Sequence, residues 1–214
     1  MLRQAIVDAC RRMNALGINQ GTSGNISARH GGTMLITPSA VPYDQLRAHD
    51  IAAMPLSAED ETWEGPRPPS TEWRFHRDIL RARPEAGAVL HAHPPYCTAL
   101  AIARREIPAC HYMIATFGGP SIRLAPYATF GTEALSRNAL AALEGRSACL
   151  LANHGMIVFA PDLPRALRKA VELEALAQHY CLSLMIGGPH LLTDAEIADA
   201  SAKFGTYGLR EKSQ

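Results

Sequence analysis

Apolar residues recur at helical spacing in several segments of the chain, and most of these segments end near glycine or proline. The first segment, MLRQAIVDACRRM, predicts an amphipathic helix and not a signal peptide. Near the C-terminus, Thr193 and Glu196 match a capping box that begins a last helix. The spacing and the stop signals together predict helices over 2–16, from Ser70 or Thr71 to Pro84, after Pro94 to about 103, over 132–143, over 163–186, and from 193 to about 204.

Short apolar runs bounded by turn residues predict the strands. These runs cover 26–29, 34–36, 51–54, 88–91, 149–152 and 156–159. Segments 55–69 and 107–127 are rich in proline and are predicted to be irregular. Helices alternate with strands, yet several strands are joined by tight turns. The order therefore predicts an α/β fold in a single domain over 1–214, a three-layer α/β/α sandwich around a mixed, largely antiparallel sheet.

Composition narrows the class of protein. Hydrophobic residues make up 47% of the 214 residues, enough for a sizeable core, and no apolar stretch approaches the length of a membrane span. With 21 Lys and Arg against 20 Asp and Glu, charge gives no reason to expect nucleic acid or a membrane as a partner. Five scattered cysteines favour reduced thiols in a cytoplasmic protein: Cys10, Cys97, Cys110, Cys149 and Cys181.

The sharpest chemical signal is His91-Ala92-His93 at the end of a predicted strand. Residues i and i+2 of a strand point to the same face, so both imidazoles can reach one ion. His154 follows another predicted strand, and three histidines leave one position of a tetrahedral zinc site open for substrate. A lone His-x-His pair is as often an ordinary core or surface feature. A structural role is favoured for the other histidines, which lack such a partner: His30, His49, His76, His111, His179 and His190.

Two segments carry residues suited to an anion. Glu72 lies at a predicted helix start beside the hydroxyls of Ser70 and Thr71, where free backbone N–H groups and the helix dipole favour phosphate. Residues 21–25, GTSGN, are small enough for a close backbone approach to an anion, although the lysine of a Walker loop is missing. From these residues alone, simple N-capping and a tight turn are the favoured interpretations.

Longer strings of residues resemble the class II aldolase/adducin family over nearly the whole chain, from Gln20 to Arg210. They are NQGTSGNIS, MLITPS, PYDQL, STEWRFH, HAHPPYCTA, HYMIATFGG, APYATFGT, NHGMI and FGTYGLR. The strings HYMIA, APYATFGT and TYGLR point to the branch of the family that acts as aldolases on sugar 1-phosphates. Together the strings are far more specific than any one motif.

The resemblance implies a zinc ion held by His91, His93 and His154, with Glu72 as the catalytic carboxylate and as a fourth ligand when no substrate is bound. The phosphate site that it implies comprises Thr22, Gly24, Asn25, Ser39, Ser70 and Thr71. The family has a Thr-Gly pair where this chain has Ser39-Ala40. Because alanine lacks the conformational freedom of glycine, we expect the loop to be shifted there.

The resemblance also implies a homotetramer with sites between subunits, in which the neighbouring chain supplies Tyr112. Phe130, Phe204 and Tyr207 would line the aldehyde side of the site, with residues 205–214 as an active-site tail. For Phe130 and Phe204, the pattern alone fits core packing equally well.

The activity implied is the reversible cleavage of L-fuculose 1-phosphate, or a related ketose 1-phosphate, to dihydroxyacetone phosphate and L-lactaldehyde. A lysine that forms a Schiff base with such a substrate has to be buried. None of the three lysines, Lys169, Lys203 and Lys212, is expected to be buried. Activation of the carbonyl group is therefore expected to come from a metal.

Other activities remain open. An aldolase for 5-deoxypentulose 1-phosphates and a sugar-phosphate dehydratase or epimerase resemble this chain in the three-histidine pattern. The aromatic strings favour an aldolase over an epimerase, but they discriminate poorly among aldehydes. A non-enzymatic interaction module, like the adducin head, would lose the zinc ligands, and all three are present here. An unrelated zinc hydrolase is disfavoured because the chain has no H-E-x-x-H helix.

Overall fold

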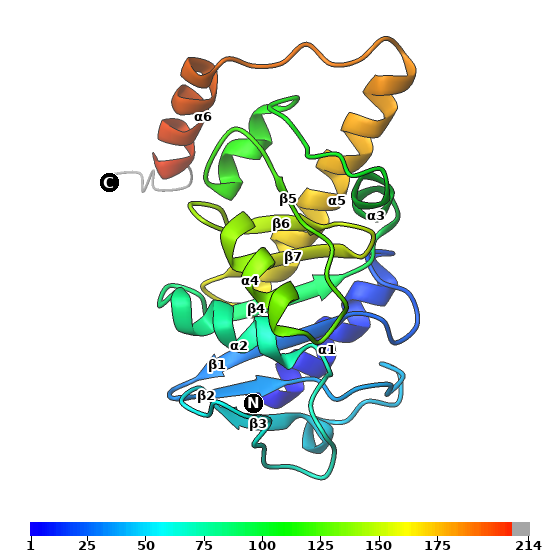
Figure 1. Ribbon diagram of the computed structural model, residues 1–214, viewed down its shortest axis with the longest axis vertical. Helices are drawn as coiled ribbons and strands as arrows, with labels where there is room; N and C mark the ends of the chain where they lie inside the picture. Colours follow the sequence, from blue (N-terminus) through cyan, green and yellow to red (C-terminus); the bar gives the residue numbers. More distant parts are fainter. Residues whose placement is uncertain (207–214) are drawn as a thin grey trace, which may run out of the picture.

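A single mixed sheet of seven strands runs through the middle of the computed structural model, which describes residues 1–206 (Figure 1). The strands are β1 (Asn25–His30), β2 (Thr33–Ile36), β3 (Ala52–Pro55), β4 (Ala88–Ala92), β5 (Arg123–Ala125), β6 (Ala148–Leu151) and β7 (Gly155–Ala160). Their order is β3-β2-β1-β4-β7-β6-β5. All neighbours are antiparallel except β5 and β6, which are parallel. The predicted mixed, largely antiparallel sheet is confirmed.

Helices cover both faces of this sheet. They are α1 (Leu2–Ala15), α2 (Trp73–Ala82), α3 (Pro95–Ile102), α4 (Glu133–Ala142), α5 (Leu163–Met185) and α6 (Asp194–Thr206), with short 3-10 helices η1 (Ala48–Asp50) and η2 (Tyr112–Phe117). The buried side chains of α1, α3 and α5 share one apolar cluster, and those of α2 and α4 share another. Two clusters separated by a sheet make three layers, which confirms the predicted sandwich. None of the described helices is both long and apolar enough to cross a membrane.

The alternation of side chains along β4 determines toward which helical layer His91 points. Leu90 belongs to the cluster of α1, α3 and α5, whereas Val89 belongs to the cluster of α2 and α4. Because alternate residues of a strand share a face, His91 points toward α2 and α4. In the ladder between β1 and β4, Asn25 pairs with His91 and Ser27 with Val89. Asn25, Ser27 and His91 therefore lie on the same face of the sheet.

Most predicted elements are present within a few residues of their expected bounds, and the main omission is β5. This strand lies in a segment that was predicted to be irregular, as does η2. With only three residues at the edge of the sheet, β5 has no apolar run of its own and is defined by its parallel pairing with β6. The capping box at α6 is confirmed, because the Thr193 N–H donates to the Glu196 carboxylate and the Glu196 N–H to the Thr193 hydroxyl.

Two local expectations were wrong. Glu72 itself is the N-cap of α2, and the Ser70 hydroxyl accepts a hydrogen bond from the Glu72 N–H, so neither Ser70 nor Thr71 caps the helix. Lys169 is partly buried, where its ammonium donates to the Thr116 carbonyl and to the Ser147 hydroxyl. Burial lowers the pKa of Lys169 to about 8. Ser147 precedes β6 whereas His154 follows it, so this lysine lies at the other end of the strand from the histidines.

Candidate metal centre and substrate cleft

Two antiparallel strands bring the predicted histidines together. His91 lies within β4, opposite Ile157 of β7, and His93 follows directly after β4. His154 lies in the turn between β6 and β7, where the preceding Asn153 has a positive φ of 54°. Such a φ is accessible to asparagine at modest cost, and it directs the chain back along the neighbouring strand.

The turn at His154 also depends on a glycine. A Cβ atom on Gly155 would lie 2.5 Å from the Ala92 carbonyl oxygen and 2.6 Å from the His93 ring. No other residue fits there without moving β4 or His93. The Asn-His-Gly sequence thus allows the two strand ends to approach closely enough for three imidazoles to meet.

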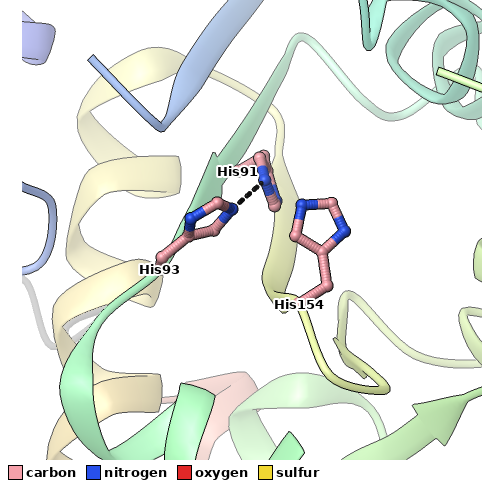
Figure 2. A group of neighbouring side chains, drawn as sticks. All are labelled: His91, His93 and His154. Atoms are coloured by element: carbon pink, nitrogen blue, oxygen red, sulfur yellow. Dashed lines mark hydrogen bonds between the residues drawn. The ribbon is translucent and has the colours of Figure 1, made fainter. Parts of the chain in front are cut away.

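The three imidazole rings face one another across a small space (Figure 2). The Nε2 atoms of His91 and His93 lie 2.8 Å apart, and a ligand nitrogen from each of the three rings lies within 4.8 Å of the other two. Nδ1 of His91 is 2.8 Å from the Met156 carbonyl oxygen, to which it can only donate. The proton on Nδ1 leaves the Nε2 lone pair free to bind a metal ion.

The carboxylate of Glu72 completes this cluster. Its Oε2 lies 3.3 Å from Nε2 of His91, and its Oε1 lies 3.4 Å from Nε2 of His154. Asn25 donates to Oε2 at 2.9 Å, but the buried Oε1 has no hydrogen-bond partner among the described residues. A buried carboxylate oxygen without a donor, facing uncharged imidazoles, is a costly arrangement unless a cation lies between them. Three imidazoles and a carboxylate are donors that suit zinc.

Burial keeps these histidines in the form that binds metal. It lowers the pKa of His91 to about 3 and that of His154 to about 4, with the neighbouring histidines adding to both effects. Burial also lowers the pKa of His93. All three rings are therefore neutral at pH 7, and metal binding requires little displacement of protons.

A cleft of about 460 Å³ opens beside the cluster. It brings together segments that are far apart in the sequence: the 22–25 loop, the 38–40 turn and the start of α2. Glu72, His93, His154 and Phe130 line this cleft. Every residue predicted for the phosphate site lines it too: Thr22, Gly24, Asn25, Ser39, Ser70 and Thr71. The cleft is therefore lined both by two of the histidines with a carboxylate and by small polar residues.

The 38–40 turn is joined to the start of α2 by hydrogen bonds. The Thr71 N–H donates to the Ser39 hydroxyl at 3.0 Å, and that hydroxyl lies 3.4 Å from the Pro69 carbonyl oxygen. Ala40 has a φ of 58°, the left-handed conformation that glycine adopts without strain. Alanine at this position therefore holds the glycine-type conformation instead of forcing another one, and the cost is local strain.

Three buried residues that support the cleft were not identified from the sequence. The Tyr43 hydroxyl donates to the Gly24 carbonyl, and Asn19 packs so closely that a Cβ atom on Gly24 would lie 2.5 Å from Asn19 Oδ1. His76, assigned only a structural role above, has Nε2 2.5 Å from Asn25 Oδ1. Its one available sequence signal is its position four residues after Glu72, which places both on the same side of α2.

The predicted aromatic residues divide between two places. Phe130 lines the cleft and is 63% exposed. Tyr112 and Phe204 instead line a separate cavity of about 730 Å³ between η2 and α6, where their rings stack with centroids 5.9 Å apart. In Figure 1, α6 lies at the far end of the molecule, beyond β5. Tyr207 and most of the predicted tail lie outside the described residues.

Comparison with known proteins agrees with this geometry. The family model described as "Class II Aldolase and Adducin N-terminal domain" matches residues 4–181. The chain is 51% identical to a 5-methylthioribulose-1-phosphate/5-deoxyribulose-1-phosphate aldolase of Rhodospirillum rubrum, over 97% of this chain and 92% of that protein. It is 49% identical to the L-fuculose phosphate aldolase of Escherichia coli K12, over 98% of this chain and 96% of that protein.

A solved structure is also similar. It is an L-fuculose 1-phosphate aldolase, which aligns with a TM-score of 0.91 at 37% identity over 95% of both chains. The family match spans most of the chain, and these relatives are similar over nearly their full lengths. The chain therefore belongs to the class II aldolase and adducin family, and to the aldolases within it.

Proposed function

We propose that this protein is a zinc-dependent aldolase that reversibly cleaves a ketose 1-phosphate to dihydroxyacetone phosphate and an aldehyde. The observation that carries the proposal is the convergence of three neutral imidazoles and the Glu72 carboxylate beside a cleft that is also lined by small polar residues. A cleft of about 460 Å³ matches the size of sites for small ligands.

His91, His93 and His154 would hold the zinc ion, which when bound acts as a Lewis acid on the substrate's carbonyl oxygen. Glu72 is the group beside it that can move a proton. In the cleavage direction its protonated carboxyl would give a proton to the carbon that becomes the hydroxymethyl group of dihydroxyacetone phosphate. In synthesis the carboxylate would remove that proton. Proton transfer of this kind typically contributes about 10²–10⁴-fold to a rate.

The small polar residues of the cleft would receive the phosphate group. Thr22 and Gly24 lie in the loop before β1, and the hydroxyls of Ser39, Ser70 and Thr71 lie around the start of α2. The Asn25 amide is hydrogen-bonded to Glu72 and to His76, so its side chain also supports the carboxylate.

Tyr112 would reach the site from a neighbouring subunit of a homotetramer and exchange a proton with the aldehyde oxygen. Support comes from the separation of the two cavities, because none of residues 1–206 lines both. Phe130 of the same chain lines the cleft and would lie on its aldehyde side. Since Phe204 stacks on Tyr112, the neighbouring subunit would bring both rings together.

Two classes of substrate have comparable support. L-Fuculose phosphate is the substrate named for relatives at 49% identity, whereas 5-deoxyribulose and 5-methylthioribulose 1-phosphates are named for a relative at 51%. They share the part of the molecule that contacts zinc and Glu72 and differ in the aldehyde released. We further propose a cytoplasmic location, which fits the five free cysteines.

The test is release of dihydroxyacetone phosphate from L-fuculose 1-phosphate, 5-deoxyribulose 1-phosphate and 5-methylthioribulose 1-phosphate. Each is assayed with zinc-loaded protein, with chelator-treated protein and after zinc is restored. We expect release from at least one ketose, lost with chelator and recovered with zinc. The ratio of kcat/KM values identifies the substrate. Zinc-loaded protein that released dihydroxyacetone phosphate from none of them would contradict the proposal.

A further inference from the structure

A chain of buried side chains leads from the sheet to the Glu72 carboxylate. It comprises Ser27 on β1, His76 on α2 and Asn25 at the start of β1. We propose that His76 is a positioning residue that orients the Asn25 amide, and through it the carboxylate of Glu72. The inference rests on the proposed function only for the role of Glu72, because the hydrogen bonds themselves are independent of it.

The direction of each hydrogen bond follows from the carboxylate. An ionised carboxylate can only accept, so the contact of 2.9 Å with Glu72 Oε2 requires Asn25 to present its NH₂ group there. Asn25 Oδ1 must then face His76, 2.5 Å from Nε2. A carbonyl oxygen is an acceptor, and His76 Nε2 therefore carries a proton and donates it.

The role of Nδ1, on the far side of the His76 ring, follows from the same kind of argument. His76 Nδ1 lies 2.8 Å from the Ser27 hydroxyl oxygen. A neutral imidazole with a proton on Nε2 has a lone pair on Nδ1, which accepts from the Ser27 O–H. Burial favours this neutral form, since it lowers the pKa of His76 well below its usual value. Each of these three hydrogen bonds is consequently donated in the direction of Glu72.

The chain is shielded from water along its length. Ser27 and His76 are fully buried, and Asn25 and Glu72 are only 4% and 6% exposed. The His76 ring also stacks on Phe75, with centroids 4.7 Å apart. In such surroundings a lost donor is not replaced by water, and an unpaired buried group has a large effect.

These hydrogen bonds favour one of the two possible orientations of the Asn25 side-chain amide. If the Asn25 side chain were rotated by half a turn, its oxygen would face the carboxylate oxygen and its NH₂ group would face the N–H of His76. Both contacts would be repulsive. The N–H of His76 excludes this orientation, and Glu72 keeps a donor on Oε2 while Oε1 remains directed toward His154.

Three variants test this role. His76→Met removes the donor at similar volume, whereas His76→Gln keeps an N–H near the position of Nε2. Ser136→Ala removes a partly buried hydrogen bond to α2, from the Ser136 hydroxyl to Asp78, which is not part of the series of hydrogen bonds that leads to Glu72. Each protein is loaded with zinc, its zinc content is measured, and kcat and KM are determined for the best ketose 1-phosphate.

We expect His76→Met to lower kcat by about 10- to 100-fold, the usual effect of losing a group that orients residues around a metal. KM should change little, because the phosphate contacts are left intact. His76→Gln should recover most of kcat. Ser136→Ala should lower the midpoint of urea unfolding without lowering kcat. Equal kcat values in the His76→Met and wild-type proteins, or equal losses in His76→Met and His76→Gln, would overturn the role.

A second measurement does not depend on activity. In zinc-free protein with ¹⁵N-labelled histidine, the two ring nitrogens of His76 are assigned by NMR from the signals missing in His76→Gln. We expect a neutral ring with its proton on Nε2 at pH 7. A proton on Nδ1, or on both nitrogens, would overturn the role of His76 alone. A wild-type protein that released no dihydroxyacetone phosphate from any ketose would overturn the proposed function together with it.

Discussion

Glu72 has two carboxylate oxygens in different surroundings, one accepting from Asn25 and one facing the histidine cluster without a hydrogen-bond donor among the described residues. Glu72→Gln keeps the shape but removes the proton acceptor. We predict a fall in kcat of about 10²–10⁴-fold, the range for a lost general base. Zinc should remain bound by the three histidines, as metal analysis would show. A variant with full turnover would exclude this role for Glu72.

Ala40 is strained by its left-handed φ of 58°. For a residue with a side chain this conformation costs about 1–2 kcal/mol, partly offset because glycine makes the unfolded chain more flexible. We predict that Ala40→Gly raises the free energy of unfolding by up to about 1 kcal/mol in urea titrations. The matched control, Ala5→Gly in the exposed face of α1, should lower it by about 1 kcal/mol. If both substitutions lowered the free energy of unfolding, the strain inferred at Ala40 would be contradicted.

Buried neutral histidines make the metal-free protein sensitive to acid. His76 and the histidines proposed to bind zinc have lowered pKa values when folded but titrate near 6.5 when unfolded. The unfolded chain therefore binds more protons, and the stabilisation present above pH 6.5 is lost as the pH falls toward 4. We predict a loss of about 1.4 kcal/mol per pH unit for each histidine that stays neutral. Urea unfolding of chelator-treated protein between pH 7 and 5 would show it, and a flat profile would contradict it.

The roles of residues could be predicted from the sequence where their spacing along one strand or helix brings the side chains together. His91 and His93 are two residues apart on a strand, so their shared face follows without a structure. Tyr43 and His76 could not be interpreted in this way. Their partners, Gly24 and Asn25, are brought to them by tertiary packing, and a buried histidine in a helix has the same local pattern whether or not it supports a site.

At the level of elements, the site depends on the register of β4. In the sheet, His91 of β4 is paired with Asn25 on one side and with Ile157 on the other. A slip of β4 by one residue would turn His91 toward the opposite apolar cluster. The apolar runs of the central strands identified them from the sequence. The edge strand β5 was missed because its three residues acquire their conformation from parallel pairing with β6, which is a long-range interaction.

At the level of the whole molecule, the separation of Tyr112 from the histidine cleft predicts complementation between subunits. Glu72→Gln and Tyr112→Phe proteins are each expected to have low activity. After mixed reassembly in equal amounts, about a quarter of the sites should combine an intact Glu72 with an intact neighbouring Tyr112. Activity recovered on reassembly, measured against each variant reassembled alone, checks this prediction. Without any recovery, Tyr112 would have to act within its own chain or not at all.

The most direct test of the central claim is proton exchange in dihydroxyacetone phosphate without any aldehyde, followed by NMR in D₂O. It requires no knowledge of the physiological sugar and isolates the proton transfer assigned to Glu72. Zinc-loaded protein should exchange one of the two protons on the hydroxymethyl carbon, and chelator or Glu72→Gln should abolish the exchange. If zinc-loaded protein left both protons in place, or if Glu72→Gln exchanged one at the wild-type rate, the metal centre and its carboxylate would not perform the reaction proposed here.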